Sequence, residues 1–534
     1  MTDTERGTAV AKAYLVGSGI ASLSAAAFLI REGGFAGDDI VILEEQDREG
    51  GSLDAAGSPE TGYTMRGGRM FEVHFDCTYD LLSSIPSLDD PAKSVTEDTF
   101  AFHEDFAWDD HARLVDGHGS IIDAHSMTFS ERDRLELVKC VATPEKLLDG
   151  KRIADLFHEE FFTTNFWAMW CTTFAFEPWH SAIEFRRYLN RFVHLFKTFD
   201  TMSGIYRTRF NQFDSIVRPL LAWLTAQGVT LQLGTRVTDL RLADGDGDAL
   251  TVKALTWDRG GKSGETAVGP DDLVLVTNGS MTANSTLGST DTVPALDTTS
   301  SSGAWQLWET LAAKHPGAGL GDPKVFDSST KDSTWESFTV TTKDPLFFKL
   351  MEEFSGSEAG KGGLITFKES SWLLTIVLNH QPHFREQPED TFVWWGYALF
   401  PDRQGDFVGK PMSECTGREI LDEVLQHLPF AERERILDGS IVIPAKMPYI
   451  TSQFLVRKAG DRPQVVPEGS TNLAFIGQYA EVPDDVVFTV EYSVRTAWTA
   501  VAQLLKLDRQ PPPVYKGRYD PKILVEALET LHRR

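Results

Sequence analysis

Residues 13–22 of the chain read Ala-Tyr-Leu-Val-Gly-Ser-Gly-Ile-Ala-Ser, and this stretch decides the fold. The four leading residues are apolar and predict a short strand, from which Gly17 allows a tight turn. Gly19 lets the backbone approach a pyrophosphate, whose charge is favoured at the N-terminus of the helix predicted next. Ser22 is small enough for that helix to pack closely on the strand. The first predicted contacts with a dinucleotide are therefore Gly17, Gly19, Ile20, Ala21 and Ser22.

A second apolar run, residues 40–43, predicts another strand and ends at Glu44. A carboxylate in this position can accept hydrogen bonds from both ribose hydroxyls of a dinucleotide. Because it would also repel a phosphate on that ribose, a 2′-phosphorylated cofactor is disfavoured. Strand, glycine-rich turn, helix, second strand and acid follow the order of a dinucleotide-binding unit. This order favours a functional site over an ordinary glycine-rich loop.

Later segments extend the predicted site. Residues 50–54 and 66–69 each contain a pair of glycines, and an apolar strand over 273–276 runs into a Thr-x-Gly turn. The strand 472–476 ends in glycine, before a helix predicted over 486–506. A cofactor domain built from both ends of the chain favours FAD over NAD, because a mobile nicotinamide needs no such enclosure. The additional predicted cofactor contacts are Glu45, Gly51, Ser52, Arg66, Gly67, Gly68, Arg69, Thr277, Gly279, Ser280, Gly477 and Ser493.

These signals predict an α/β fold class with a Rossmann-like FAD-binding domain of the two-dinucleotide-binding type, assembled from discontinuous segments. A mixed α+β substrate domain and a helical, aromatic-rich subdomain complete the prediction. Residues 363–368 and 371–378 are predicted to pair as a hairpin. The predicted division assigns 12–120, 205–285 and 440–508 to the FAD-binding domain, 121–204 to the helical subdomain, 286–439 to the substrate-binding domain and 509–534 to a short tail.

Bulk properties exclude several classes of function. The 534 residues carry a formal net charge of −27, which argues against binding to nucleic acid and against broad electrostatic binding to anionic lipid. Four scattered cysteines form neither a disulfide framework nor a metal-type pair, so no metal is predicted and a reducing cytoplasm is expected. The N-terminus lacks the apolar core of a signal peptide, and no segment is apolar enough to span a bilayer.

Several motifs carry a resemblance to one family, and their combination is specific. They span nearly the whole chain and include the segments 17–21, 50–54, 66–69, 174–177, 179–181, 211–212, 381–384, 397–400, 447–452, 460–463 and 484–489. In these segments the chain resembles the oleate hydratases, also called myosin-cross-reactive antigens. The resemblance implies bound FAD and the addition of water to the cis double bond of a free unsaturated fatty acid such as oleate, giving a hydroxy fatty acid.

The resemblance also implies a role for individual residues. Tyr188 matches the tyrosine proposed to donate the proton, and it lies at the edge of an apolar helical stripe. Met70 stands where the family usually places the glutamate thought to orient or activate water, and methionine can neither accept a proton nor hold water strongly. The hypothesis is that Glu72, or else His74 or Asp76, takes part instead. The alternative reading is that all three are only local polar residues.

Other matched positions concern the substrate carboxylate. Gln212 and Asn379 match residues that the family uses there, whereas the family's nearby threonine corresponds to Val377, so one hydrogen bond is missing. His383 is expected to support this loop and not to bind a metal. The aromatic block 161–179 either lines an acyl tunnel or is plain core, and one helix can do both.

Two other functions remain open at this point. A redox flavoenzyme, such as an amine oxidase or a desaturase, would oxidise its substrate, because a dinucleotide motif by itself predicts redox chemistry. A fatty-acid-binding protein that has lost activity together with the glutamate at position 70 is the second alternative. The family's N-terminal extension and longer C-terminal segment are not seen, so a monomer is expected rather than a homodimer, with at most transient membrane contact.

Overall fold

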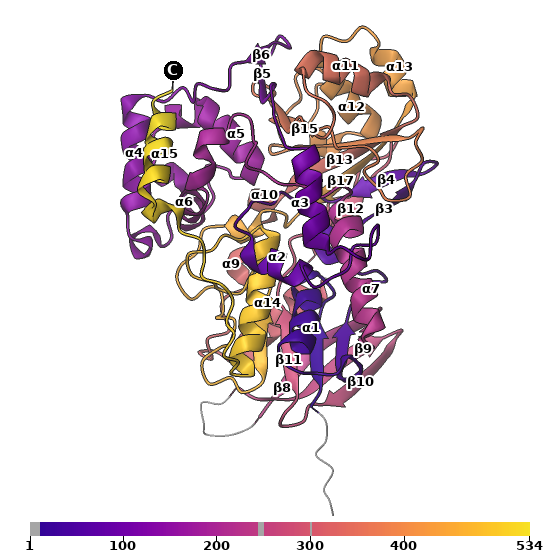
Figure 1. Cartoon of the computed structure of the whole chain (residues 1–534), viewed down its shortest axis with the longest axis vertical. Coiled ribbons are helices and arrows are strands. Elements are labelled where there is room, and N and C mark those ends of the chain that lie inside the picture. Colours follow the sequence, from indigo (N-terminus) through magenta and orange to yellow (C-terminus); the bar gives the residue numbers. More distant parts are fainter. Residues whose placement is uncertain (1–10, 244–249, 300–301, 534) are drawn as a thin grey trace, which may run out of the picture.

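The computed structural model describes residues 11–243, 250–299 and 302–533, and Figure 1 shows their arrangement. A parallel sheet with its helices lies at one end of the molecule, below a large mixed sheet and a helical part. The predicted Rossmann-like α/β fold is confirmed, including its assembly from segments far apart in the sequence.

The parallel sheet has the strand order β18-β11-β1-β2-β7. Its central strand places Leu15 opposite Leu275 on one side and Ile42 on the other. Both faces of the sheet are covered, which explains why its strands are continuous apolar runs. Helices α1 (Ile20–Arg31) and α14 (Val490–Leu504) lie side by side on it, with the rings of Phe28 and Trp498 stacked at 4.8 Å. The strands are β1 (Ala13–Val16), β2 (Ile40–Leu43), β7 (Thr230–Gln232), β11 (Leu273–Thr277) and β18 (Leu473–Ile476).

Helix α14 begins later than the sequence predicts. Residues 484–489 form a loop, and Thr489 caps the helix by accepting a hydrogen bond from the backbone N–H of Tyr492. Asp484 and Phe488 in this loop have positive φ angles of 65° and 70°, a conformation that side chains other than glycine seldom adopt. Such strain persists only where surrounding contacts impose it, and it concentrates at functional sites.

The large mixed sheet has the order β12-β17-β13-β16-β15-β14-β5-β6. The hairpin predicted near residues 363–378 is confirmed by the antiparallel pairing of β14 with β15. Helices α11, α12 and α13 cover one face, where Phe347 stacks on Trp394 at 4.5 Å. The bounds are β5 (Leu114–Val115), β6 (Ile121–Ile122), β12 (Thr286–Leu287), β13 (Trp335–Thr342), β14 (Leu364–Phe367), β15 (Leu374–Val377), β16 (Phe392–Ala398), β17 (Ser440–Met447), α11 (Leu346–Ser355), α12 (Gly417–Gln426) and α13 (Arg433–Asp438).

This sheet crosses two edges of the predicted domain division, which stays a prediction. Strand β5 pairs with β14 and β6 pairs with β5, and both lie around position 120, where the FAD-binding segment is predicted to end. Strand β17 pairs along its whole length with β13, so residues 440–447 form part of the large sheet. The reason is that these strands satisfy their backbone hydrogen bonds with partners far away in sequence, which local patterns do not reveal.

The helical part contains α4 (Glu131–Ala142), α5 (Asn165–Phe174) and α6 (Ala182–Arg191). The expected short tail contains a further helix, α15 (Pro521–Leu531), which lies beside α4, where Arg134 donates a hydrogen bond to the carbonyl of Leu531. Within the described ranges, none of the helices combines the length and apolarity needed to cross a membrane. The other elements are β3 (Ala55–Ser58), β4 (Gly62–Met65), β8 (Thr235–Leu242), β9 (Val252–Arg259), β10 (Lys262–Ala267), α2 (Asp76–Leu82), α3 (Val95–Asp105), α7 (Arg218–Ala226), α8 (Gly303–Lys314), α9 (Lys324–Asp327) and α10 (Thr330–Ser333).

Candidate functional site

A cavity of ≈ 360 Å³ opens at the carboxyl ends of the parallel strands. Gly17 has a φ of +94°, as the turn out of β1 requires. Gly19 and Gly51 meet at their backbones, so a Cβ added to Gly51 would lie 3.0 Å from the Cα of Gly19. Helix α1 begins here without a side-chain cap, which leaves its first N–H groups available to an anion. Glycine cradle and helix end fit the pyrophosphate of a dinucleotide.

Most predicted cofactor contacts line this cavity, but four do not. The Ser22 hydroxyl lies 3.1 Å from that of Thr277 and joins helix α1 to strand β11. Gly67 lines neither cavity described here, whereas Gly68 and Arg69 line the second one. The predicted cofactor contacts that line this cavity, called the dinucleotide cavity below, are Gly17, Gly19, Ile20, Ala21, Glu44, Glu45, Gly51, Ser52, Arg66, Thr277, Gly279, Ser280, Gly477 and Ser493.

Polar groups in this cavity are held by neighbours from several segments. Glu44 accepts hydrogen bonds of 2.7 Å from the backbone N–H and the hydroxyl of Ser18. Arg66 is fixed by Asp54, with nitrogen–oxygen distances of 3.1 and 3.2 Å. The sequence reading missed lining residues such as Ser18, Asp54 and Gln478, although each adjoins or lies within a motif that it identified.

A second, smaller cavity of ≈ 50 Å³ brings together several positions that the sequence analysis matched to site residues of the family. Met70, Gln212, Val377 and Asn379 all line it. Aromatic side chains form one part of the remaining wall, including Trp335, Trp395, Tyr397 and Phe488, and polar side chains form much of the rest. Aromatic surface beside converging polar groups suits a small organic ligand with a polar end.

Several polar atoms that face this cavity region are buried without a hydrogen-bond partner among the described residues. They are Nδ2 of Asn379, Nδ1 of His380 and Nε2 of His383. Burial, assisted by the nearby charge of Arg207, lowers the pKa of His383 to about 3, so its ring is neutral at physiological pH. Buried polar atoms are normally paired, so this group indicates a place for a polar ligand.

Gln212 is expected to bind the substrate carboxylate, and its contacts are only partly compatible with this role. Its side-chain oxygen accepts a hydrogen bond of 3.2 Å from the Arg69 backbone N–H, and its amide nitrogen donates to the Arg69 carbonyl at 3.3 Å. Gln212 therefore holds the 66–69 segment in place, next to Met70. His383 supports its loop as predicted, because its carbonyl accepts hydrogen bonds from the backbone and the side chain of Asn211.

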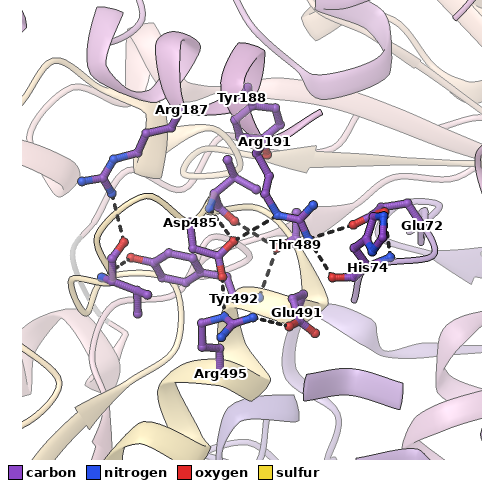
Figure 2. Close-up of polar contacts among 12 residues, drawn as sticks. Glu72, His74, Arg187, Tyr188, Arg191, Asp485, Thr489, Glu491, Tyr492 and Arg495 are labelled. Atoms are coloured by element: carbon purple, nitrogen blue, oxygen red, sulfur yellow. Dashed lines mark hydrogen bonds and ion pairs between the residues drawn. The ribbon is translucent and has the colours of Figure 1, made fainter. Parts of the chain in front are cut away.

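Tyr188 lies on α6 with its ring among Phe174, Phe176, Phe192 and Phe454. It is 1% exposed, and its hydroxyl donates a hydrogen bond of 2.5 Å to the carbonyl of Val487 (Figure 2). Burial raises the pKa of Tyr188 well above its ordinary value, so the phenol stays protonated at neutral pH. Tyr188 does not line the second cavity itself, but the residue after its acceptor, Phe488, does.

Glu72 lies away from both cavities. Its carboxylate contacts Arg191 at 2.8 Å and accepts a hydrogen bond from the His74 backbone N–H (Figure 2). It also contacts His194 at 3.0 Å. Although burial alone would raise it, these contacts hold the pKa of Glu72 below its ordinary 4.5. The hypothesis that Glu72 replaces the family glutamate is therefore not supported by its position. Met70 lines the second cavity, whereas the carboxylate of Glu72, two residues later, contacts Arg191 on α6.

The ion pair of Glu72 belongs to a buried chain of charges. Arg191 also lies 3.8 Å from Asp485, which accepts a hydrogen bond of 2.8 Å from Arg495 on α14. Arg495 in turn contacts Glu491 at 2.9 Å, and Figure 2 shows the whole chain. These contacts join α6 to α14 and hold the 484–489 loop, which carries the acceptor of Tyr188.

Replacing Glu72 with glutamine is expected to lower the free energy of unfolding by about 3 kcal/mol at neutral pH, because the buried Arg191 loses its nearest counter-ion at 2.8 Å and keeps only Asp485 at 3.8 Å. The folded-state pKa of Glu72 is depressed, so its contribution is present above the ordinary carboxylate range and is lost as the pH falls through the folded-state value. Urea denaturation at several pH values measures both effects.

Glu265→Gln is the matched control, because its 3.1 Å pair with Arg241 is exposed and worth about 1 kcal/mol or less. The folded Glu72→Gln variant is expected to keep its catalytic activity. If Glu72→Gln is fully stable but inactive, this result would instead support a role of Glu72 in activating water.

Together, the fold and the two cavities define a protein of the Rossmann-like class, with one cavity that fits a dinucleotide and a separate ligand cavity with aromatic side chains in its wall. The chain is similar in overall fold to putrescine oxidase (TM-score 0.55, 11% identity, covering 93% of this chain and 99% of that one). It is likewise similar to cyclohexylamine oxidase from Brevibacterium oxydans IH-35A (TM-score 0.52, 12% identity, with the same coverage). At such identities the likeness concerns the fold alone.

Residues 10–502 match the model of the MCRA family, and the chain belongs to this family. It is 39% identical to the oleate hydratase of Streptococcus pyogenes serotype M49 (strain NZ131), over 97% of this chain and 89% of that protein. It is 34% identical to the linoleate hydratase of Lactiplantibacillus plantarum, over 97% of this chain and 98% of that protein. The resemblance stated from the sequence motifs is confirmed.

Proposed function

We propose that this protein is a fatty acid hydratase, a hydro-lyase that adds water to the cis double bond of a free unsaturated fatty acid such as oleate. The product would be a hydroxy fatty acid of the 10-hydroxystearate type. Its relatives, an oleate hydratase and a linoleate hydratase, are similar over nearly its entire length. The observation that carries the proposal is the aromatic-walled cavity with unpaired polar atoms, next to Met70 and to the loop that binds Tyr188.

FAD is the proposed cofactor. The glycine cradle, the uncapped start of α1 and the carboxylate of Glu44 suit a pyrophosphate and a ribose, and the two-ended assembly suits a dinucleotide that stays bound. Hydration moves no electrons overall, so the cofactor would contribute shape and charge next to the substrate cavity. Arg66, Ser52 and Gln478 are among the residues that would hold it.

Hydration of an isolated alkene requires a proton donor at one carbon and a water molecule at the other. Tyr188 is proposed as the donor: its O–H bond breaks as a C–H bond forms, and the added water then returns a proton to the phenolate. The phenol does not line the cavity, whereas Phe488, the residue after its acceptor Val487, does, so the 484–489 loop would have to move for the phenol to reach a substrate there. Met70 offers no proton acceptor to the water.

The proposal predicts the mass of the product. Protein loaded with FAD and incubated with oleate under anaerobic conditions should form a product heavier by one water, and ¹⁸O-labelled water should place its oxygen in the new hydroxyl group. Parallel samples with chemically reduced flavin show whether the redox state alters the rate.

The other two functions give different results in the same experiment. A redox flavoenzyme of the amine oxidase or desaturase type would remove hydrogens and bleach the flavin as product forms. A fatty-acid-binding protein would bind oleate without product in either redox state. A cytoplasmic monomer remains the prediction for the assembled protein, and light scattering after gel filtration measures its mass.

A further inference from the structure

Arg207 is a cation in the second cavity for which the structure provides no counter-ion. Its side chain is half-buried and lines the cavity, and burial lowers its pKa to about 9. Its guanidinium lies over the ring of Trp108, 3.7 Å from the centroid. Among the described residues, no hydrogen bond and no ion pair reaches Arg207. Stacking covers one face of the guanidinium, but its N–H donors lie in the plane and remain unused.

Asp110 is the carboxylate whose charge Arg207 senses most, but it is occupied elsewhere. Its two oxygens accept hydrogen bonds of 3.0 Å from the backbone N–H groups of Ala112 and Gly363. No ion pair joins it to Arg207. Arg207 is half-buried, and its loss of hydration without a hydrogen-bonded partner has a cost that an anion in the cavity would offset.

The other unpaired polar atoms of the cavity lie in the same region. Asn379 and His380 follow strand β15, and His383 comes close enough for the Arg207 charge to lower its pKa. These side chains offer neutral donors, whereas Arg207 adds a charge and a planar fork that matches a carboxylate. Val377 contributes only an apolar wall.

We propose that Arg207 is an additional residue that recognises the substrate's ionised carboxylate, beside the positions that the family resemblance already implies. The inference rests on the proposed hydration of free fatty acids and names the group that selects them. An ionised fatty acid would neutralise Arg207, whereas the corresponding methyl ester or alcohol would leave it unpaired. Arg207 therefore makes the cavity selective for free acids and supplies the attraction that the missing threonine hydroxyl does not.

The test compares Arg207→Met with Arg207→Lys, on oleate and on methyl oleate. For Arg207→Met, KM for oleate is expected to rise about 30-fold or more, with kcat changed much less, and KM for methyl oleate to stay nearly constant. The lysine variant keeps the charge and should recover part of the loss. Arg241→Met removes an exposed charge from β8 and is the matched control.

A second readout does not depend on turnover. Oleate labelled with ¹³C at its carboxyl carbon, bound to the wild-type protein, should titrate at lower pH by NMR than when bound to a folded Arg207→Met variant. Equal titration in both proteins, or an unchanged preference for acid over ester, would overturn the inference. If the wild-type protein binds oleate but does not hydrate it, the proposed function fails, and the NMR titration still decides the role of Arg207.

Discussion

Replacing Tyr188 with phenylalanine is expected to lower kcat for oleate hydration by about 10²- to 10⁴-fold, the range typical of losing a general acid. The substitution removes one oxygen and keeps the ring among Phe174, Phe176, Phe192 and Phe454, so the aromatic packing is preserved. KM is expected to change little, because the phenol lies outside the cavity wall. Steady-state kinetics with product quantified by mass spectrometry measures both constants.

Tyr492→Phe is the matched control for this experiment. Tyr492 is also fully buried, and its hydroxyl also donates to a backbone carbonyl, that of Ala480, at 2.6 Å. The same hydroxyl accepts a hydrogen bond of 3.0 Å from the Val482 backbone N–H. Both variants leave a buried carbonyl without its donor and should lose about 1–3 kcal/mol of stability, with the larger loss expected for Tyr492→Phe. Only Tyr188→Phe should lose hydration. Equal activity in the two folded variants would exclude Tyr188 as the proton donor.

Replacing Gly51 with alanine is expected to weaken FAD binding by on the order of 100-fold, equivalent to about 2.7 kcal/mol, and to lower activity in parallel. Gly51 has a φ of +57°, and its new methyl group would lie 3.0 Å from the Cα of Gly19. Gly19 begins helix α1, so the displacement moves the N–H groups proposed to hold the pyrophosphate. Flavin fluorescence titration of the apoprotein measures the affinity.

Gly34→Ala separates backbone strain from damage to the cavity. Gly34 has a similar φ of +71°, but nothing lies within 4 Å of its added Cβ, and it does not line the dinucleotide cavity. Both variants should lose about 1 kcal/mol of stability through strain. Only Gly51→Ala should lose FAD. Unchanged flavin affinity in folded Gly51→Ala would contradict the proposed place of the cofactor.

The predictable parts of the fold are those with a strong local signature. Strands β1 and β11 are continuous apolar runs because both faces of a parallel sheet are buried, and the hairpin of β14 and β15 joins neighbours in sequence. The pairings of β5 with β14 and of β17 with β13 join distant segments. Their short or mixed apolar patterns fit several partners, so the sequence alone did not identify these two pairings.

The candidate site also contains residues that the sequence identified and residues that only the structure identified. Met70, Val377 and Asn379, which match family positions in the sequence, line one cavity in the structure. Gln212 reaches the same cavity, but its amide is occupied by the Arg69 backbone. Nothing in the sequence identified Arg207 as a site residue beyond its nearness to the Asn211-Gln212 pair. A sequence does not show whether an arginine is exposed to solvent or half-buried in a cavity without a partner.

The sequence by itself determined that this protein has a dinucleotide cradle, and its motifs placed it in a family. Glycine turns and strand ends depend on residues close together in the chain, so their geometry can be predicted from the local sequence. Only the tertiary structure decided which charged groups are available. Glu72 is neutralised by Arg191 from helix α6, whereas Arg207 faces a cavity without a counter-ion. Burial and distant partners set both outcomes, because the energy of a charge depends on what surrounds it in space.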